Sequence, residues 1–346
     1  MIEMRLNRTK IALLAAGSAL LLPAAAVAGP TLDAIKGRAE LNCGVSTGTS
    51  IGKSTLDDQG NWTGFEADFC RAVAAAILGD GAKVNFVPLE FKNAFTSLQS
   101  GSVDMLARSA TWTMSRDTEF ALEWAGIYIY DGQGFLVSKA SGITSAKELA
   151  GASICVTSGT TTELNLADYF RTNRMDYTPI TVSSPDQSIA NLESARCDAY
   201  TNEVGGLASY RLGLSDPDSY TILADVISKE PLGPVVREDD QQFEDVVEWT
   251  RHALIIAEEF GVTQANVAEM AATTEKPELR RFLGAEGEFG TKLGIPNDWA
   301  VKTIQTTGNY GELFERTLGS NSKANIARGV NTLWSQGGLL YAPPVR

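Results

Sequence analysis

An arginine that follows a cluster of hydroxyl side chains is the first group in this chain with clear binding chemistry. Ser109, Thr111 and Arg116 lie within eight residues, directly after an apolar run at 103–107 that predicts a buried strand. A planar guanidinium matches both oxygens of a carboxylate, and the free N–H groups at a helix start attract anions. The stretch therefore predicts a site for the carboxylate of a small ligand. The simpler alternative is that Thr113 caps a helix and Arg116 is solvated.

Two later turns between a strand and a helix carry similar polar groups. In the segment SGTTT at 158–162, a glycine admits a close ligand, and the hydroxyls and N–H groups around Thr161 can bind an anion. An ordinary capped helix explains this segment equally well. At 201–203, Asn202 or Glu203 can accept from an ammonium group, although Asn202 is equally suited to cap the next helix.

The elements that must position these groups alternate between strands and helices. In the first hundred residues the apolar patterns predict strands at 41–45, 84–89 and 103–107, alternating with helices that include 69–77 and 91–99. This order predicts a parallel sheet with right-handed crossovers. Ligands of such sheets bind at the carboxyl ends of the strands, where the hydroxyl cluster falls.

Glycine-rich crossings divide the rest of the chain into two lobes. The segments 127–138 and 229–237 are predicted to connect the lobes, and helices are expected after the second crossing up to about residue 318. We therefore expect an α/β fold with a discontinuous first lobe at 29–133 and 231–346, which ends in a helical region. The second lobe is expected at 134–230, with the ligand cleft between the two.

The first 28 residues have the pattern of a signal peptide. A basic region is followed by an apolar core at 11–22 and by the small-residue site AVA at 26–28. We expect cleavage before Gly29 and export of the protein to the periplasm. The alternative is an uncleaved anchor. The formal net charge of -13 argues against nucleic acid as the main partner.

Four cysteines in an exported chain predict two disulfides. Three pairings are possible, and we favour Cys43–Cys70 with Cys155–Cys197 because each pair then lies within one lobe. A metal site is not expected, because no C-x-x-C spacing occurs and His252 is the only histidine. His252 falls in a late helix, away from any predicted strand end, so no catalytic residue is assigned.

Several motifs in order resemble the polar amino-acid-binding proteins of ABC importers. They are CGV at 43–45, GFEADFCRAV at 64–73, LQSGSVD at 98–104, SGTT at 158–161, GNYGELFER at 308–316 and GGLLYAPP at 337–344. The resemblance implies a type II periplasmic binding fold, in which two lobes are joined by two hinge strands.

The resemblance also implies a role for each candidate residue. Arg116 would grip the α-carboxylate of the ligand, with Thr161 donating to the same group from the second lobe. Ser109 and Thr111 would accept from the α-ammonium or support the carboxylate. Phe91 would pack beside the ligand.

Two positions depart from the family pattern. Asn202 stands where the family usually has an aspartate that pairs with the ammonium, so Glu203 or Glu66 is expected to compensate. The segment 46–53 lacks the usual aromatic residue, which removes a stacking contact. A site that reads only the shared α-amino and α-carboxylate groups predicts broad specificity.

The function expected from the sequence is a monomeric periplasmic receptor. It captures free L-amino acids and delivers them to an inner-membrane ABC permease, with no cofactor. The alternative is an enzyme on the same fold, such as a small-acid dehydratase or a cell-wall lyase, which would need a general acid or base in the cleft. A sensing domain of a larger receptor is a third hypothesis, which the expected lack of a membrane span after the signal disfavours.

Overall fold

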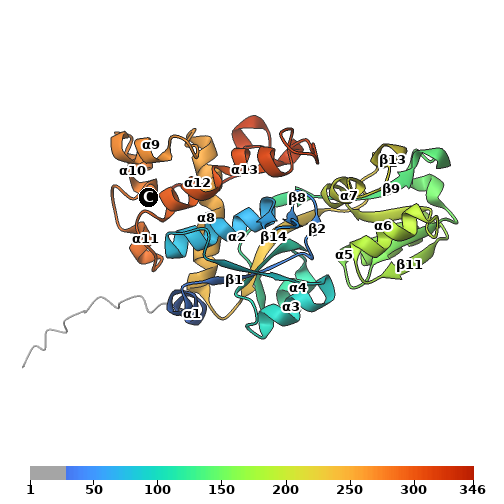
Figure 1. Ribbon diagram of the computed structural model, residues 1–346, viewed down its shortest axis with the longest axis horizontal. Helices are drawn as coiled ribbons and strands as arrows, with labels where there is room; N and C mark the ends of the chain where they lie inside the picture. Colours follow the sequence, from blue (N-terminus) through green and yellow to red (C-terminus); the bar gives the residue numbers. More distant parts are fainter. Residues whose placement is uncertain (1–28) are drawn as a thin grey trace, which may run out of the picture.

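The computed structural model describes residues 29–346, and these form two α/β lobes side by side (Figure 1). The signal peptide predicted for residues 1–28 lies outside the described residues. One sheet has the strand order β5-β1-β6-β14-β7, with β8 paired to β14, and the other has the order β11-β10-β12-β9-β13. The two-lobe fold expected from the sequence is therefore present.

The sheet of lobe 1 is half parallel and half antiparallel. Its strands are β1 (Leu41–Val45), β5 (Val84–Pro88), β6 (Met105–Thr111), β7 (Leu122–Trp124), β8 (Ile129–Asp131) and β14 (Glu230–Arg237). β5, β1 and β6 are parallel, as predicted, but β14 runs antiparallel to β6, β7 and β8. The segment 229–237, predicted as the return crossing, also forms a central strand of this sheet, and the sequence analysis did not assign that strand. β6 also extends to Thr111, so Ser109 and Thr111 belong to the strand itself.

Helices pack on both faces of this sheet. The first four are α1 (Pro30–Arg38), α2 (Phe65–Leu78), α3 (Phe91–Gln99) and α4 (Met114–Glu119). In α2 nearly every residue is buried, and the helix ends at Gly79, whose left-handed backbone (φ 73°) closes the last turn. The segment that lacks the family's aromatic residue leads into a small sheet made of β2 (Thr49–Ser50), β3 (Ser54–Leu56) and β4 (Trp62–Thr63).

Lobe 2 is a smaller sheet with its own core. Its strands are β9 (Gln133–Ser138), β10 (Ser153–Thr157), β11 (Thr178–Val182), β12 (Ala199–Glu203) and β13 (Tyr220–Ile222), and its helices are α5 (Thr161–Asn173), α6 (Pro185–Glu193) and α7 (Val204–Arg211). Short 3-10 turns occur at Lys139–Ser141, Ala146–Leu149 and Pro217–Ser219.

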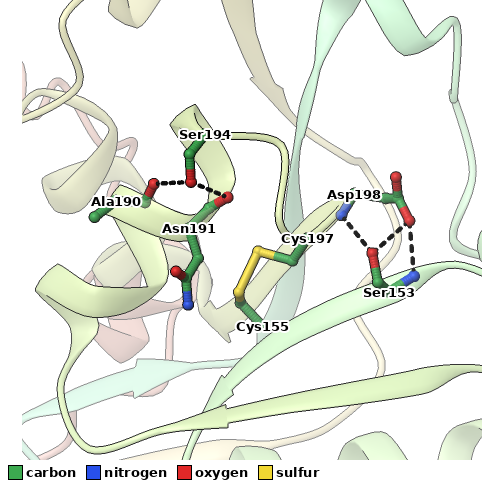
Figure 2. The surroundings of a disulfide bond; sticks show 7 residues. All are labelled: Ser153, Cys155, Ala190, Asn191, Ser194, Cys197 and Asp198. Atoms are coloured by element: carbon green, nitrogen blue, oxygen red, sulfur yellow. Dashed lines mark hydrogen bonds between the residues drawn. A yellow bond between two sulfur atoms is a disulfide. The ribbon is translucent and has the colours of Figure 1, made fainter.

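One disulfide lies in each lobe, and both are the pairs favoured from the sequence. Cys43 of β1 bonds Cys70 of α2, and Cys155 of β10 bonds Cys197 just before β12. Beside the second bond, the Asp198 carboxylate accepts from the backbone N–H and hydroxyl of Ser153 at 2.8 and 2.6 Å (Figure 2). The neighbouring strands β10 and β12 are therefore fixed at the end opposite to the cleft.

The C-terminal region is helical and shares the core of lobe 1. Its elements are α8 (Gln241–Glu259), α9 (Val267–Thr273), α10 (Pro277–Phe282), α11 (Phe289–Lys292), α12 (Trp299–Thr307), α13 (Tyr310–Thr317) and 3-10 turns at Gly329–Asn331 and Trp334–Gln336. One buried apolar cluster runs from Leu32 to Val345, so these helices belong to the core and not to an appendage (Figure 1). Within residues 29–346, no helix is both long and apolar enough to cross a membrane.

The two lobes are connected by two adjacent strands. β8 of the first sheet passes through Gly132 into β9 of the second, and β14 returns beside β8 with Glu230 opposite Asp131. A side chain at Gly132 would lie 2.3 Å from Val226 and 2.9 Å from the carbonyl oxygen of Ser228. Glycine is therefore required where the chain leaves lobe 1, since no larger residue fits between these segments.

Candidate functional site

The cleft between the lobes collects residues from the carboxyl ends of strands in both sheets. Five of the six residues that the sequence analysis named line it: Phe91, Ser109, Thr111, Thr161 and Asn202. They come from α3, β6, α5 and β12. The sheet topology thus brings together segments that lie up to about a hundred residues apart in the sequence.

Arg116, the sixth residue, lies directly next to this lining. Thr113 does cap α4, since its hydroxyl accepts from the backbone N–H of Arg116 at 3.3 Å, but Arg116 is 7% exposed and not solvated. Its Nη1 donates to the carbonyl oxygen of Thr111 at 2.9 Å, and its guanidinium carbon lies 4.8 Å from the centre of the Phe91 ring. Burial lowers the pKa of Arg116 to about 10, while Glu203 and Glu230 oppose this shift. The arginine is therefore a desolvated cation at the end of β6.

Ser109 has an unusual backbone conformation, and two buried side chains hold its hydroxyl. Its φ angle of 52° is left-handed, which is costly for a residue with a side chain. Its hydroxyl donates to the Glu66 carboxylate at 2.6 Å and accepts from the Nζ of Lys53 at 3.2 Å. Lys53 is only 2% exposed, and its Nζ lies 3.8 Å from Asp131 in β8. Ser109 thus turns the end of β6 at the floor of the cleft.

Glu230 joins residues of the two lobes across the cleft. One of its carboxylate oxygens accepts from the hydroxyls of Thr111 at 2.6 Å and Thr161 at 2.9 Å. The other accepts from Asn165 in α5 at 2.6 Å and from Ser228 at 2.7 Å. The hydroxyls of Thr111 and Thr161 lie 3.4 Å apart. Because their protons are used by Glu230, these hydroxyls offer only lone pairs to a ligand.

At the end of β12, Asn202 has both ends of its amide occupied. Its Oδ1 accepts from the backbone N–H of Glu203 at 2.8 Å, and its Nδ2 donates to the hydroxyl of Tyr200. Glu203 lines the cleft, whereas Glu66 does not and is held by Ser54 and Ser109. Burial raises the pKa of Glu203 to about 7, against the attraction of Lys53. Glu203 is therefore the acidic group at this edge of the cleft.

Sequence analysis missed three charged residues of this region: Lys53, Arg108 and Glu230. Arg108 lines the cleft, is 9% exposed, and has a buried Nε without a hydrogen-bond partner among residues 29–346. The signal for Arg108 was a charge directly after the run 103–107 that predicts a buried strand. Glu230 lay in a segment predicted to be a crossing, and Lys53 lay in a segment to which no strand or helix was assigned, and charges in such segments are usually solvated.

The only histidine does not contribute to the cleft. His252 is buried in α8, where its Nε2 lies 3.3 Å from Glu248, and it does not line the cleft. Burial lowers the pKa of His252. In the part of the chain that the structure describes, no cluster of histidine, cysteine and acidic side chains could hold a metal ion.

Comparison with known proteins identifies the family. Residues 43–283 match the model of bacterial extracellular solute-binding proteins, family 3, and the chain belongs to this family. It is 50% identical over 342 residues to the general L-amino acid-binding periplasmic protein AapJ of Rhizobium johnstonii, covering 98% of this chain and all of AapJ. It is also 50% identical over 325 residues to the glutamate/glutamine/aspartate/asparagine-binding protein BztA of Rhodobacter capsulatus, covering 94% of this chain and 96% of BztA.

A solved structure of high similarity gives the same result. The periplasmic binding protein of an ABC transporter from Brucella ovis, with glutathione bound, superimposes with a TM-score of 0.89 at 52% sequence identity. The match covers 91% of this chain and 99% of that one, so it includes the helical C-terminal region.

Proposed function

We propose that this protein is the periplasmic substrate-binding component of an ABC importer for L-amino acids, with broad specificity. The observation that carries the proposal is the meeting of Thr111 of lobe 1 with Thr161 of lobe 2, 3.4 Å apart beside the buried Arg116. Groups that can hold the α-carboxylate and the α-ammonium thus converge between two lobes that hinge strands connect. Full-length relatives whose names describe amino-acid binding, one of them as periplasmic, support the proposal.

The α-carboxylate is held from both lobes in this proposal. Arg116 supplies the charge, and the backbone N–H groups at the start of α5, around Thr161, supply hydrogen bonds and the positive end of the helix dipole. Among the described residues the Arg116 guanidinium makes one hydrogen bond, so most of its five N–H donors are free for a ligand. Phe91 packs against the same guanidinium and gives the ligand an apolar wall.

The α-ammonium is held by lone pairs and by one carboxylate. Glu230 orients the hydroxyls of Thr111 and Thr161 as acceptors, and Glu203 supplies the negative charge that Asn202 lacks. This assignment of Glu203 over Glu66 is supported by the position of the two residues, because Glu203 lines the cleft and Glu66 does not. A site built on the two α-groups, with hydroxyl-rich walls beyond them, accepts many side chains.

In this proposal the ligand-bound form delivers the amino acid to an inner-membrane permease. The lobes close over the ligand by rotating about the paired strands β8 and β14, so the permease meets two different surfaces in the two states. The protein acts as a monomer and performs no chemistry on its ligand. The enzyme alternative requires turnover, and the conversion of bound amino acids during incubation would favour it.

Thermal-shift and calorimetric screening of the mature protein against the twenty amino acids tests the proposal. We expect stabilisation by many L-amino acids and none by their D-enantiomers. Glutathione belongs in the panel because its glutamyl residue has a free α-amino and a free α-carboxylate group, as an amino acid does. Absence of binding by every amino acid would overturn the proposed function, and stabilisation by a single amino acid would overturn the broad specificity.

A further inference from the structure

Arg108 is a second guanidinium at the cleft, and the binding of the two α-groups does not use it. It lies in β6, one residue before Ser109, and nine-tenths of its surface is buried. Its Nε has no hydrogen-bond partner in the described chain. Buried polar atoms almost always have a partner, and a buried guanidinium is costly to leave unpaired. An unpaired N–H at a ligand cleft indicates a partner supplied by the ligand.

The surroundings of Arg108 are arranged for an acceptor. Its guanidinium carbon lies 4.8 Å from the centre of the Phe91 ring, which leaves its N–H edge free for a planar partner. Burial lowers the pKa of Arg108, and the carboxylates of Glu66 and Glu203 attract it from a distance. Among the described residues, these carboxylates make no ion pair with it, since Glu66 is held by Ser54 and Ser109. The cation is thus retained in the cleft without being neutralised.

Two further hydrogen-bonding groups line the same cleft. Tyr210 comes from α7 in lobe 2, and burial raises its pKa, so its hydroxyl keeps the proton that it can donate. Ser46 follows β1, and its buried hydroxyl also lacks a partner in the described part of the chain. Arg108, Tyr210 and Ser46 therefore offer donors from both lobes, in addition to the groups assigned to the α-carboxylate and the α-ammonium.

We propose that Arg108 determines ligand preference by binding the side-chain carboxylate or carbonyl of the amino acid. This inference rests on the proposed function, since it assumes that an amino acid occupies the cleft. A glutamate or aspartate side chain neutralises the buried guanidinium through charge-assisted hydrogen bonds. Glutamine and asparagine satisfy its donors without neutralising it, apolar side chains leave it unpaired, and lysine or arginine repel it.

The expected order of affinity is therefore acidic, then amide, then apolar, then basic side chains. The α-groups still give affinity for many amino acids, and Arg108 sets the order of affinity among them. Two buried guanidinium groups, one for each carboxylate, make a dicarboxylic amino acid the best ligand of this cleft.

The test compares ligands in one variant. Calorimetry of the mature protein with L-glutamate, L-glutamine and L-alanine is repeated for Arg108→Gln. We expect the affinity for glutamate to fall about a hundredfold and the affinity for alanine to change by less than about threefold, since a buried unpaired charge is removed. Equal loss for all three ligands would overturn the inference, because Arg108 would then act on the α-groups. Unchanged affinity for glutamate would overturn it as well.

A milder variant keeps the test valid if Arg108→Gln does not fold. Tyr210→Phe removes one donor near Arg108, and we expect a loss of about tenfold for glutamate with alanine unaffected. Equal effects on glutamate and alanine in this variant also contradict the inference. Failure of the proposed function is distinguishable, because the unmodified protein would then bind none of the three ligands.

Discussion

The hydroxyl of Thr161, at the first turn of α5, donates to the carboxylate of Glu230, at the first residue of β14, at 2.9 Å. The same carboxylate oxygen accepts from Thr111 of lobe 1. A single buried acid therefore connects the start of a lobe 2 helix to the end of a lobe 1 strand. Because this contact joins the two lobes, we expect Glu230 to couple the geometry of the ligand site to lobe closure.

Replacing Glu230 should weaken both closure and ligand binding. In Glu230→Gln one acceptor oxygen becomes an NH₂ group that faces donors from Thr111, Thr161 or Asn165. Hydrogen bonds to a charged group contribute about 1.5–3 kcal/mol each, so we expect at least about a tenfold loss of affinity for every amino acid. Calorimetry measures this loss, and small-angle scattering at saturating ligand should show a less compact protein. Ser228→Ala, which removes one donor only, is the matched control and should change affinity less; equal affinities in all three proteins would contradict the role.

Removing the charge of Arg116 should lower affinity for all amino acids alike. A carboxylate that loses its buried cationic partner costs about 2–5 kcal/mol, which is about thirtyfold or more in affinity. Arg116→Gln, tested by calorimetry with alanine and glutamate, should show this loss for both ligands. Arg171→Gln is the control, because Arg171 is a largely exposed arginine of lobe 2. An unchanged affinity in Arg116→Gln would show that the α-carboxylate is bound elsewhere.

Affinity should rise with pH through the neutral range. Burial raises the pKa of Glu203 to about 7. The nearby charges of Glu230 and Asp131 add to this shift, and Lys53 opposes it. The carboxylate of Glu203 also attracts the guanidinium groups of Arg108 and Arg116. A ligand ammonium favours the ionised form, so protonated Glu203 must lose its proton when the ligand binds.

Between pH 8 and pH 6 we expect affinity for L-alanine to fall about tenfold, because Glu203 in the ligand-free protein becomes mostly protonated. Calorimetry in buffers of different ionisation enthalpy should detect release of up to one proton on binding. The Glu203→Gln variant should bind more weakly at pH 8 and lose the pH dependence. A pH dependence that persists in this variant would assign it to another group.

Loss of one disulfide should lower the stability of the lobe that contains it and leave the disulfide of the other lobe intact. The Cys155–Cys197 bond closes 42 residues of lobe 2, which corresponds to about 4 kcal/mol in the chain-entropy model. The double variant Cys155→Ser with Cys197→Ser should therefore lower the unfolding temperature of lobe 2 while Cys43–Cys70 remains closed in lobe 1. Scanning calorimetry with and without a reductant checks this, and an unchanged transition in the double variant would show that the bond carries no stability.

The parallel half of lobe 1 could be predicted because its local patterns agree with the fold. Apolar runs bounded by glycine marked β1 and β5, and the spacing of buried residues marked α2. β14 was not predicted as a strand because Pro231, Gly233 and Pro234 are typical of loops. The strand is stabilised instead by pairing with its neighbours on both sides. A strand whose pairing depends on distant segments leaves little signal in its own residues.

The parts of the candidate site that lie in a single turn between a strand and a helix could be predicted from the sequence. Thr111 and Thr161 were found because hydroxyls at strand ends are visible in the sequence, and their meeting followed from the topology. Arg108 and Glu230 were missed because their importance is set by burial, which depends on tertiary packing. The sequence could not choose between Glu203 and Glu66 as the expected ammonium partner, because only the folded chain shows that Glu203 lines the cleft and Glu66 does not.

The pairing of β8 with β14 has a mechanical consequence. Two connections that are hydrogen-bonded side by side are expected to restrict lobe 2 to a swing about one line, whereas a single flexible linker permits rotation about several axes. In such a motion, ligand binding changes one angle, the angle between the two lobes. If amino acids of different size and charge produce the same angle, as the proposed function requires, one docking surface on the permease would suffice for all of them.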